Sequence, residues 1–66
     1  MENQERERRV MRFREVRGTV SLSRSTVWRK VRDGSFPRPI RIGKSAVGWI
    51  ASEVQDWIAE QAAARE

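Results

Sequence analysis

The side chains best suited to chemistry in this sequence are arginines, lysines and hydroxyls gathered in its middle. Residues 24–44 contain seven basic residues and one acidic residue, Asp33, which gives this stretch a net charge of +6. Guanidinium and ammonium groups bind phosphate, and the planar arginine fork can also donate two hydrogen bonds to one guanine edge. The cluster favours recognition of a polyanion, although small soluble proteins also often carry many charges.

Catalytic chemistry has few candidates in this chain. The sequence contains no cysteine and no histidine, which excludes a thiol nucleophile, a disulfide framework and a zinc site of the usual ligands. Glu53 and Asp56 are three residues apart, but favourable charge at a helix N-terminus already explains both. Gly34, Gly43 and Gly48 are scattered and do not form a phosphate-binding loop. We therefore expect no enzyme activity, no metal site and no cofactor.

The charge is distributed unevenly along a chain that is long enough for one small domain. Its 66 residues carry a net charge of +5, with +2 over residues 1–23 and −3 over residues 45–66. A basic centre beside an acidic tail predicts an oriented electrostatic footprint. The longest apolar run, residues 46–51, is far short of the ~20 residues that span a bilayer, and the first residues lack a secretory signal. We expect a cytoplasmic, nucleoid-associated protein with no membrane partner.

Two short helices are predicted ahead of the basic cluster. We expect residues 1–11 to form a charged, solvated arm and residues 12–66 to form the domain. Apolar residues at positions 13, 16 and 20 predict one face of a brief helix that ends near Val20. Ser23 is a good N-cap for a second helix over residues 23–33, and Gly34 suits the position just past its end. Two helices joined by about three residues predict a helix-turn-helix.

The second half of the chain predicts a hairpin and a last helix. Ile40-Arg41-Ile42 alternates apolar and basic residues, Gly43-Lys44-Ser45 offers a turn, and residues 46–50 can return, which makes residues 40–50 a hairpin. Ser52 and Gln55 fit a capping box that would open the last helix. One face of that helix would close over the core with Val54, Trp57, Ile58, Gln61 and Ala62. The predicted fold class is mainly α with a small β-hairpin, in the order α-α-β-β-α.

The second helix carries the best candidates for recognition. If Val27 and Val31 point inward, then Ser25, Arg29 and Arg32 lie on the opposite face with Thr26 beside them. Arg24 lies in the first turn, and Ser23 with nearby amides could hold a phosphate. A helix fits the major groove of duplex DNA, where its N-terminal residues usually meet base edges. Trp28 falls at the edge of the buried face, while Trp49, Trp57, Phe13 and Phe36 are predicted core residues.

The hairpin adds basic residues beside this helix. Arg41 lies on a strand, and Lys44 and Ser45 lie at the turn, so the hairpin could reach the flanking backbone or an adjacent minor groove. Such contacts add affinity and salt dependence more than sequence choice. Arg38 lies between two prolines, and either a phosphate contact or simple solubilising charge would explain it.

Three segments together resemble the AlpA family of phage and prophage regulators. They are LSRSTVWRK from Leu22, DGSFPRPIRIGKSAVGW from Asp33 and SEVQDWI from Ser52. The resemblance covers about residues 12–60 and implies a winged helix-turn-helix that binds DNA, as a transcriptional activator or as an excisionase. By position, it makes Arg24, Ser25, Thr26, Arg29 and Lys30 readers or clamps and puts Arg41 and Lys44 on the wing. Members commonly have glycine where Ser21 stands, and a basic residue where Ser45 stands, so the wing contact is expected to shift to Lys44.

Two hypotheses of function follow. The first is a sequence-specific double-stranded DNA-binding regulator or recombination directionality factor of a mobile element, with helix 23–33 in the major groove and residues 40–50 as the wing. The alternative is a protein-interaction module that docks an integrase or a further copy of itself and binds DNA only weakly through charge. Cooperative binding to repeated sites is predicted, because one small module reads too short a site to be selective. RNA binding is a more distant alternative, since single-strand recognition needs exposed aromatic residues.

Overall fold

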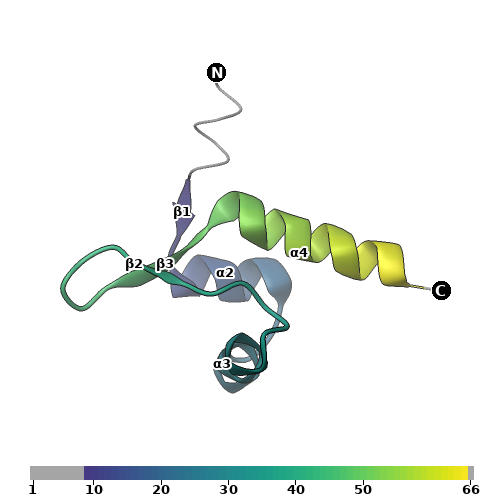
Figure 1. Ribbon diagram of the computed structural model, residues 1–66, viewed down its shortest axis with the longest axis horizontal. Coiled ribbons are helices and arrows are strands. Elements are labelled where there is room, and N and C mark those ends of the chain that lie inside the picture. Colours follow the sequence, from purple (N-terminus) through teal and green to yellow (C-terminus); the bar gives the residue numbers. More distant parts are fainter. Residues whose placement is uncertain (1–8, 66) are drawn as a thin grey trace.

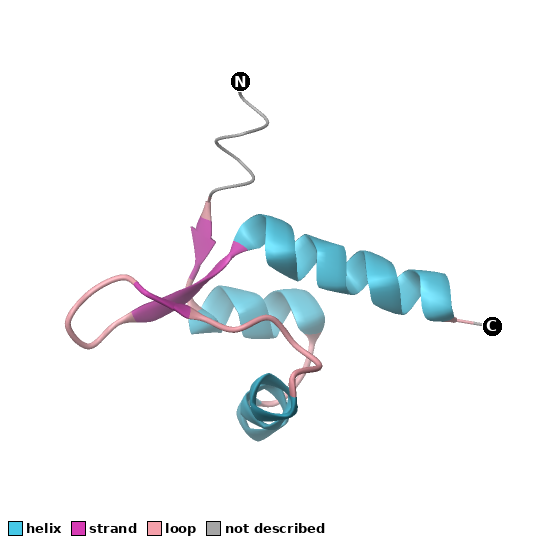
Figure 2. Cartoon of the chain, in the orientation of Figure 1, coloured by secondary structure: helices cyan, strands magenta, loops and turns pink. Residues whose placement is uncertain are grey.

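The computed structural model describes residues 9–65 and is mainly helical, with a small sheet at one side (Figure 1). Its elements are β1 (Val10–Met11), α2 (Phe13–Val20), α3 (Arg24–Asp33), β2 (Ile40–Arg41), β3 (Val47–Ile50) and α4 (Ala51–Ala64). From α2 onward they follow the predicted α-α-β-β-α order of a winged helix-turn-helix, which is confirmed. Loops occupy the hairpin tip and the segment between α3 and β2 (Figure 2).

The sheet has a third strand that we did not predict. Its order is β1-β3-β2, with both pairs antiparallel, and Val10 pairs with Ile50 while Met11 pairs with Trp49. Met11 is only 1% exposed. The predicted boundary between arm and domain after residue 11 is therefore wrong for Val10 and Met11. These two residues belong to the folded domain, since they pair with strand residues that lie 40 and 38 positions further along the chain. Residues 1–8 of the predicted arm lie outside the described residues.

The helix-turn-helix forms as its capping chemistry predicts. Ser23 is the N-cap of α3, and its Oγ accepts a hydrogen bond from Thr26 N at 3.3 Å. Gly34 ends α3 in the left-handed conformation, at φ 84°. Ser21 ends α2 in the same region, at φ 59°, which side chains with a Cβ adopt at a cost. Ser21 thus takes up a glycine-type conformation at the position where the resembled family commonly has glycine.

The last helix starts differently from the prediction. α4 begins at Ala51 directly after β3, with Ile50 as its N-cap and no side-chain capping bond, so the predicted capping box of Ser52 and Gln55 is wrong. Instead, Ala51 N donates to Arg9 O at 2.7 Å, and the backbone beside β1 satisfies this first amide. Val54 is buried and Trp57 and Ile58 are partly buried, but Gln61 and Ala62 are exposed. The end of α4 extends beyond the core (Figure 1).

The core is centred on Trp49, which is fully buried as predicted. The ring centroids of Phe13, Trp28 and Phe36 lie 6.0, 5.6 and 6.4 Å from that of Trp49. Phe36 is buried as predicted, Trp28 lies half-buried at the edge, and Phe13 and Trp57 are half-buried where we expected core. Trp49 Nε1 donates to Pro37 O at 2.7 Å, which ties the loop after α3 to β3. The sheet, α2 and α3 are therefore joined by one set of aromatic contacts.

Candidate nucleic-acid interface

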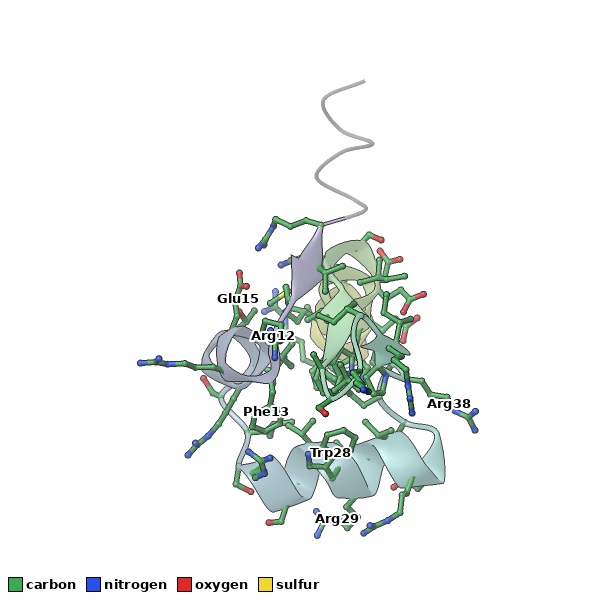
Figure 3. All side chains as sticks on the ribbon, turned by 90° about the vertical axis from the view of Figure 1, so that its left-hand side faces the viewer. Arg12, Phe13, Glu15, Trp28, Arg29 and Arg38 are labelled. Atoms are coloured by element: carbon green, nitrogen blue, oxygen red, sulfur yellow. The ribbon has the colours of Figure 1, made fainter. Side chains whose placement is uncertain are left out.

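The outward side of α3 carries polar and basic side chains alone. Ser25, Arg29 and Arg32 are exposed, and Figure 3 shows Arg29 directed away from the rest of the molecule. On the inward side, Val27 is fully buried, and Trp28 and Val31 pack against the core. Thr26 and Lys30, on the flanks, are half-buried. The predicted helix face is thus present, with two of its candidate residues less accessible than the others.

Two hydroxyl groups at the start of α3 bind each other. Ser23 Oγ donates to Thr26 Oγ1 at 2.8 Å while it accepts from Thr26 N. The Ser23 proton is therefore used within the cap, whereas the Thr26 hydroxyl proton stays free to donate outward. Beside this pair, the Arg24 guanidinium lies over the Phe13 ring, with Cζ 4.7 Å from the ring centroid. The helix start thus offers one free hydroxyl donor and one arginine held by an aromatic ring.

The hairpin forms a wing whose tip is basic and exposed. Ile40 pairs with Gly48 and Arg41 with Val47, and Ile42 N donates to Ala46 O at 2.9 Å to close the turn. The side chains of Arg41, Lys44 and Ser45 are all exposed. The wing extends from the body of the molecule on the side opposite the end of α4 (Figure 1). Arg38, also exposed, lies on the loop that leads into β2 and points outward (Figure 3).

A hollow beside the start of α3 includes two arginines that we did not single out from the sequence. It is lined by Arg14, Arg17 and Gly18 of α2 together with Ser21, Leu22 and Ser23 of the turn. Arg14 and Arg17 are three residues apart on the exposed side of α2, and this spacing could have identified them. We considered the basic stretch 24–44 and so missed these two bases, which lie shortly before it in the sequence.

Most acidic groups lie apart from the bases of α3, but Glu15 lies on α2, where it pairs with Arg9, and Asp33 lies at the end of α3. Asp33 ends α3, and its Oδ1 accepts hydrogen bonds from Ser35 Oγ at 2.6 Å and Ser35 N at 2.9 Å. These bonds, and then the charges of Lys30 and Arg29, lower the pKa of Asp33 below its ordinary value. Glu53, Asp56 and Glu60 are on α4. The exposed face of α3 therefore presents positive charge.

The comparison with known families agrees with this architecture. A sequence profile described as prophage CP4-57 regulatory protein (AlpA) matches residues 9–62. The chain belongs to the AlpA family. The matched region begins beside β1 and ends in α4, so it contains all three strands, α2, α3 and most of α4.

A phage protein supports the same assignment. The uncharacterized protein ORF88 of Enterobacteria phage P4 is 40% identical over 58 residues, which is 88% of this chain and 66% of the phage protein. This AlpA-family chain thus spans slightly less than two thirds of the length of that relative. The family match confirms the resemblance that was predicted over about residues 12–60.

A second hollow of the AlpA-family domain has the opposite character. Glu53, Asp56 and Glu60 of α4 line it on one side, and Gly34, Ser35, Phe36 and Pro37 line it on the other, with the half-buried Trp57 between them. Trp57 Nε1 donates to Ser35 O at 2.6 Å, which holds the two sides together. This acidic hollow is a separate surface from the basic face of α3. Within residues 9–65 there is no group of metal-ligating side chains and no helix long and apolar enough to cross a membrane.

Proposed function

We propose that the protein is a sequence-specific double-stranded DNA-binding protein of a phage or mobile element, which acts as a transcriptional regulator, as an excisionase, or as both. In this proposal α3 enters the major groove, and the wing over residues 40–50 contacts the flanking backbone or minor groove. One observation carries the proposal: α3 is packed by Val27 and Trp28, while its outward side shows solvent only polar and basic groups. A helix presented in this way suits the width of the major groove.

The exposed residues of α3 divide into readers and clamps. Arg29 is directed outward from the middle of the helix (Figure 3). Arg24 lies at the start of the helix, and both are proposed to read base edges, with guanine the best partner for an arginine fork. Ser25 is exposed beside them and is proposed as a less selective reader. Lys30 and Arg32 lie toward the end of α3 and are proposed to bind phosphate.

The remaining contacts are proposed to hold the backbone. At the helix start, Ser23 and Thr26 lie beside the hollow with Arg14 and Arg17, so a phosphate there would meet two guanidinium groups and the amides of the first turn. On the wing and its approach, the proposed contacts are Arg38, Arg41, Lys44 and Ser45. These contacts add affinity and salt dependence without choosing a sequence.

We propose no catalytic role, cofactor or small-molecule ligand for this domain. The carboxylates Glu53 and Asp56 are exposed on α4, away from the basic face of α3. A protein that binds phage or chromosomal DNA would act in the cytoplasm, beside the nucleoid.

The test is a selection from random duplex DNA with the full chain, in which the bound fractions are sequenced at two salt concentrations. We expect an enriched motif that persists at the higher salt. The control variant is Arg65→Ala, which removes one positive charge beyond the end of α4 and should leave the motif unchanged. Binding that is lost steeply with salt and enriches no motif would refute sequence-specific recognition.

The acidic hollow favours a second candidate function, a surface for a protein partner. Its three carboxylates surround the half-buried Trp57, and aromatic residues are enriched in protein interfaces. A basic segment of an integrase, a recombinase or a further copy of this chain would suit it. The test is binding to a duplex with two adjacent sites. Asp56→Asn should reduce cooperativity and leave binding to a single site unchanged, whereas independent occupancy by the wild-type protein would refute a contact between copies.

A further inference from the structure

The partner of Arg24 is an aromatic ring from the preceding helix. Arg24 is exposed at the first position of α3, and the first turn of that helix contains no acidic residue. Across residues 9–65, the ion pair formed is that of Arg9 with Glu15, which leaves the Arg24 guanidinium without a carboxylate. Its Cζ instead lies 4.7 Å from the centroid of the Phe13 ring, within the range of a cation–π contact.

The Phe13 ring is itself held in place by the core. It stacks on Trp28, with the ring planes 8° apart and the centroids at 6.3 Å, and its centroid lies 6.0 Å from that of Trp49. Trp49 is fully buried and is fixed by its hydrogen bond to Pro37 O. Phe13 lies at the junction of α2 and α3 (Figure 3). The ring that contacts Arg24 is therefore held in place by aromatic residues of α3 and the sheet.

This arrangement affects how an arginine can read a base. A free arginine side chain has many rotamers, and it loses that freedom when its fork binds a base edge. A cation–π contact restricts the side chain in advance and uses none of the guanidinium N–H donors, which stay available for guanine O6 and N7. Among the described residues, Arg29 and Arg32 have no such contact with a ring.

We propose that Phe13 is a positioning residue for base recognition: from α2, its ring orients Arg24 toward a base edge at the start of α3. Phe13 acts through Arg24 and does not itself touch the DNA. The inference rests on the proposed function, because it requires α3 to lie in the major groove. It adds a residue of the first helix to the determinants of sequence choice.

The experiment compares selections with the wild-type chain, Arg24→Ala, Phe13→Leu and Phe13→Tyr. Arg24→Ala identifies the base pair that Arg24 reads. Phe13→Leu removes the aromatic face and should lower discrimination at that base pair about two- to fivefold, the ratio that corresponds to a cation–π contact at an exposed site. Phe13→Tyr keeps the face and should restore the preference. Discrimination at the base pair read by Arg29 should stay unchanged in all three variants.

A measurement on the wild-type chain does not depend on how Phe13→Leu folds. In the free protein, the Nε–H resonance of Arg24 should be shifted upfield by the ring current of Phe13, and the shift should persist when a duplex with the selected motif is added. A shift that disappears on binding would mean that Arg24 leaves the ring to reach DNA, which would overturn the proposal.

The outcomes separate this inference from the proposed function. If the wild-type chain enriches no motif, the proposed function fails and the inference fails with it. If the wild type enriches a motif that Phe13→Leu leaves unchanged, only the inference fails. An equal loss of affinity for every sequence in Phe13→Leu would assign Phe13 a purely structural role and would also overturn the inference.

Discussion

Gly48 offers the sharpest test of how the wing is joined to the domain. A Cβ at this position would overlap Val10 Cγ1, and it would lie 3.2 Å from the Met11 carbonyl oxygen and 3.4 Å from Ile42 Cδ1. Gly48 lies on β3, Val10 and Met11 lie on β1, and Ile42 follows β2. Since Gly48 does not have a positive φ, the cost of Gly48→Ala arises from crowding between strands.

The expected cost follows from two opposing effects. Overpacking a close contact costs about 1–3 kcal/mol. Replacing glycine by alanine raises the free energy of unfolding by about 0.4–1 kcal/mol, because alanine lowers the conformational entropy of the unfolded chain. Because Met11 contributes a backbone atom that cannot turn aside, we expect Gly48→Ala to lower the free energy of unfolding by about 1–2 kcal/mol. For a domain of this size, that corresponds to a fall in Tm of roughly 4–16 °C.

The assay is thermal and urea unfolding followed by circular dichroism, with Gly18→Ala as the matched control. Gly18 lies on the exposed side of α2, and a Cβ there would meet no atom within 4 Å, so alanine should stabilise the helix by up to about 1 kcal/mol. In a Val10→Ala background, Gly48→Ala should cost less, because the overlapping methyl is gone. A Gly48→Ala variant as stable as the wild type, or one whose cost is the same in both backgrounds, would refute the reasoning.

Four further predictions concern the turn, two proposed DNA contacts and pH. Ser21→Gly should raise the free energy of unfolding by about 1 kcal/mol in the same assay, because a left-handed residue with a Cβ is strained. Arg29→Ala should lose about 1–3 kcal/mol of discrimination at one base step in the DNA selection. Lys44→Ala should weaken binding to all sequences alike and flatten the slope of log K against log salt by about one unit. The lowered pKa of Asp33 stabilises the fold above about pH 4, and that contribution should be lost as the pH falls through the lowered value, which unfolding of the wild type and Asp33→Asn at several pH values would show.

Each of these has a result that would contradict it. Unchanged or lower stability in Ser21→Gly would mean that the turn carries no strain. An unaltered motif in Arg29→Ala would remove it from base recognition, and equal salt slopes in Lys44→Ala and the wild type would remove the wing tip from the interface. An acid dependence that is the same in Asp33→Asn and the wild type would show that this carboxylate does not contribute.

Local chemistry explains which parts of the fold were predictable from the sequence. The cap at Ser23, the end at Gly34 and the inward face of α3 each depend on residues within one or two helical turns, and all three are confirmed. The family resemblance over about residues 12–60 extended these local predictions to the winged arrangement, which is also confirmed.

Contacts between distant segments explain what was missed. β1 has only two residues, too few for a periodic pattern, and it forms because Ile50 and Trp49 supply its partners. The same pairing places Arg9 O beside Ala51 N, which makes a side-chain cap at Ser52 unnecessary. The hollow with Arg14 and Arg17 was missed for another reason: its lining lies within residues 14–23, just before the basic stretch 24–44 that the prediction considered.

The pairing of β1 with β3 also sets the order in which the chain can fold. The contacts within α2 and α3 are local and can form as soon as those helices exist, but Val10 cannot pair until Ile50 is available. Closing so long a loop costs conformational entropy, and the burial of Met11 and Trp49 offsets this cost only once the two strands have paired. During synthesis, the residues of α2 and α3 are therefore added to the chain before β2 and β3, the strands that complete the sheet. A chain interrupted before residue 50 would present α3, the helix proposed to bind DNA, on an unfinished core.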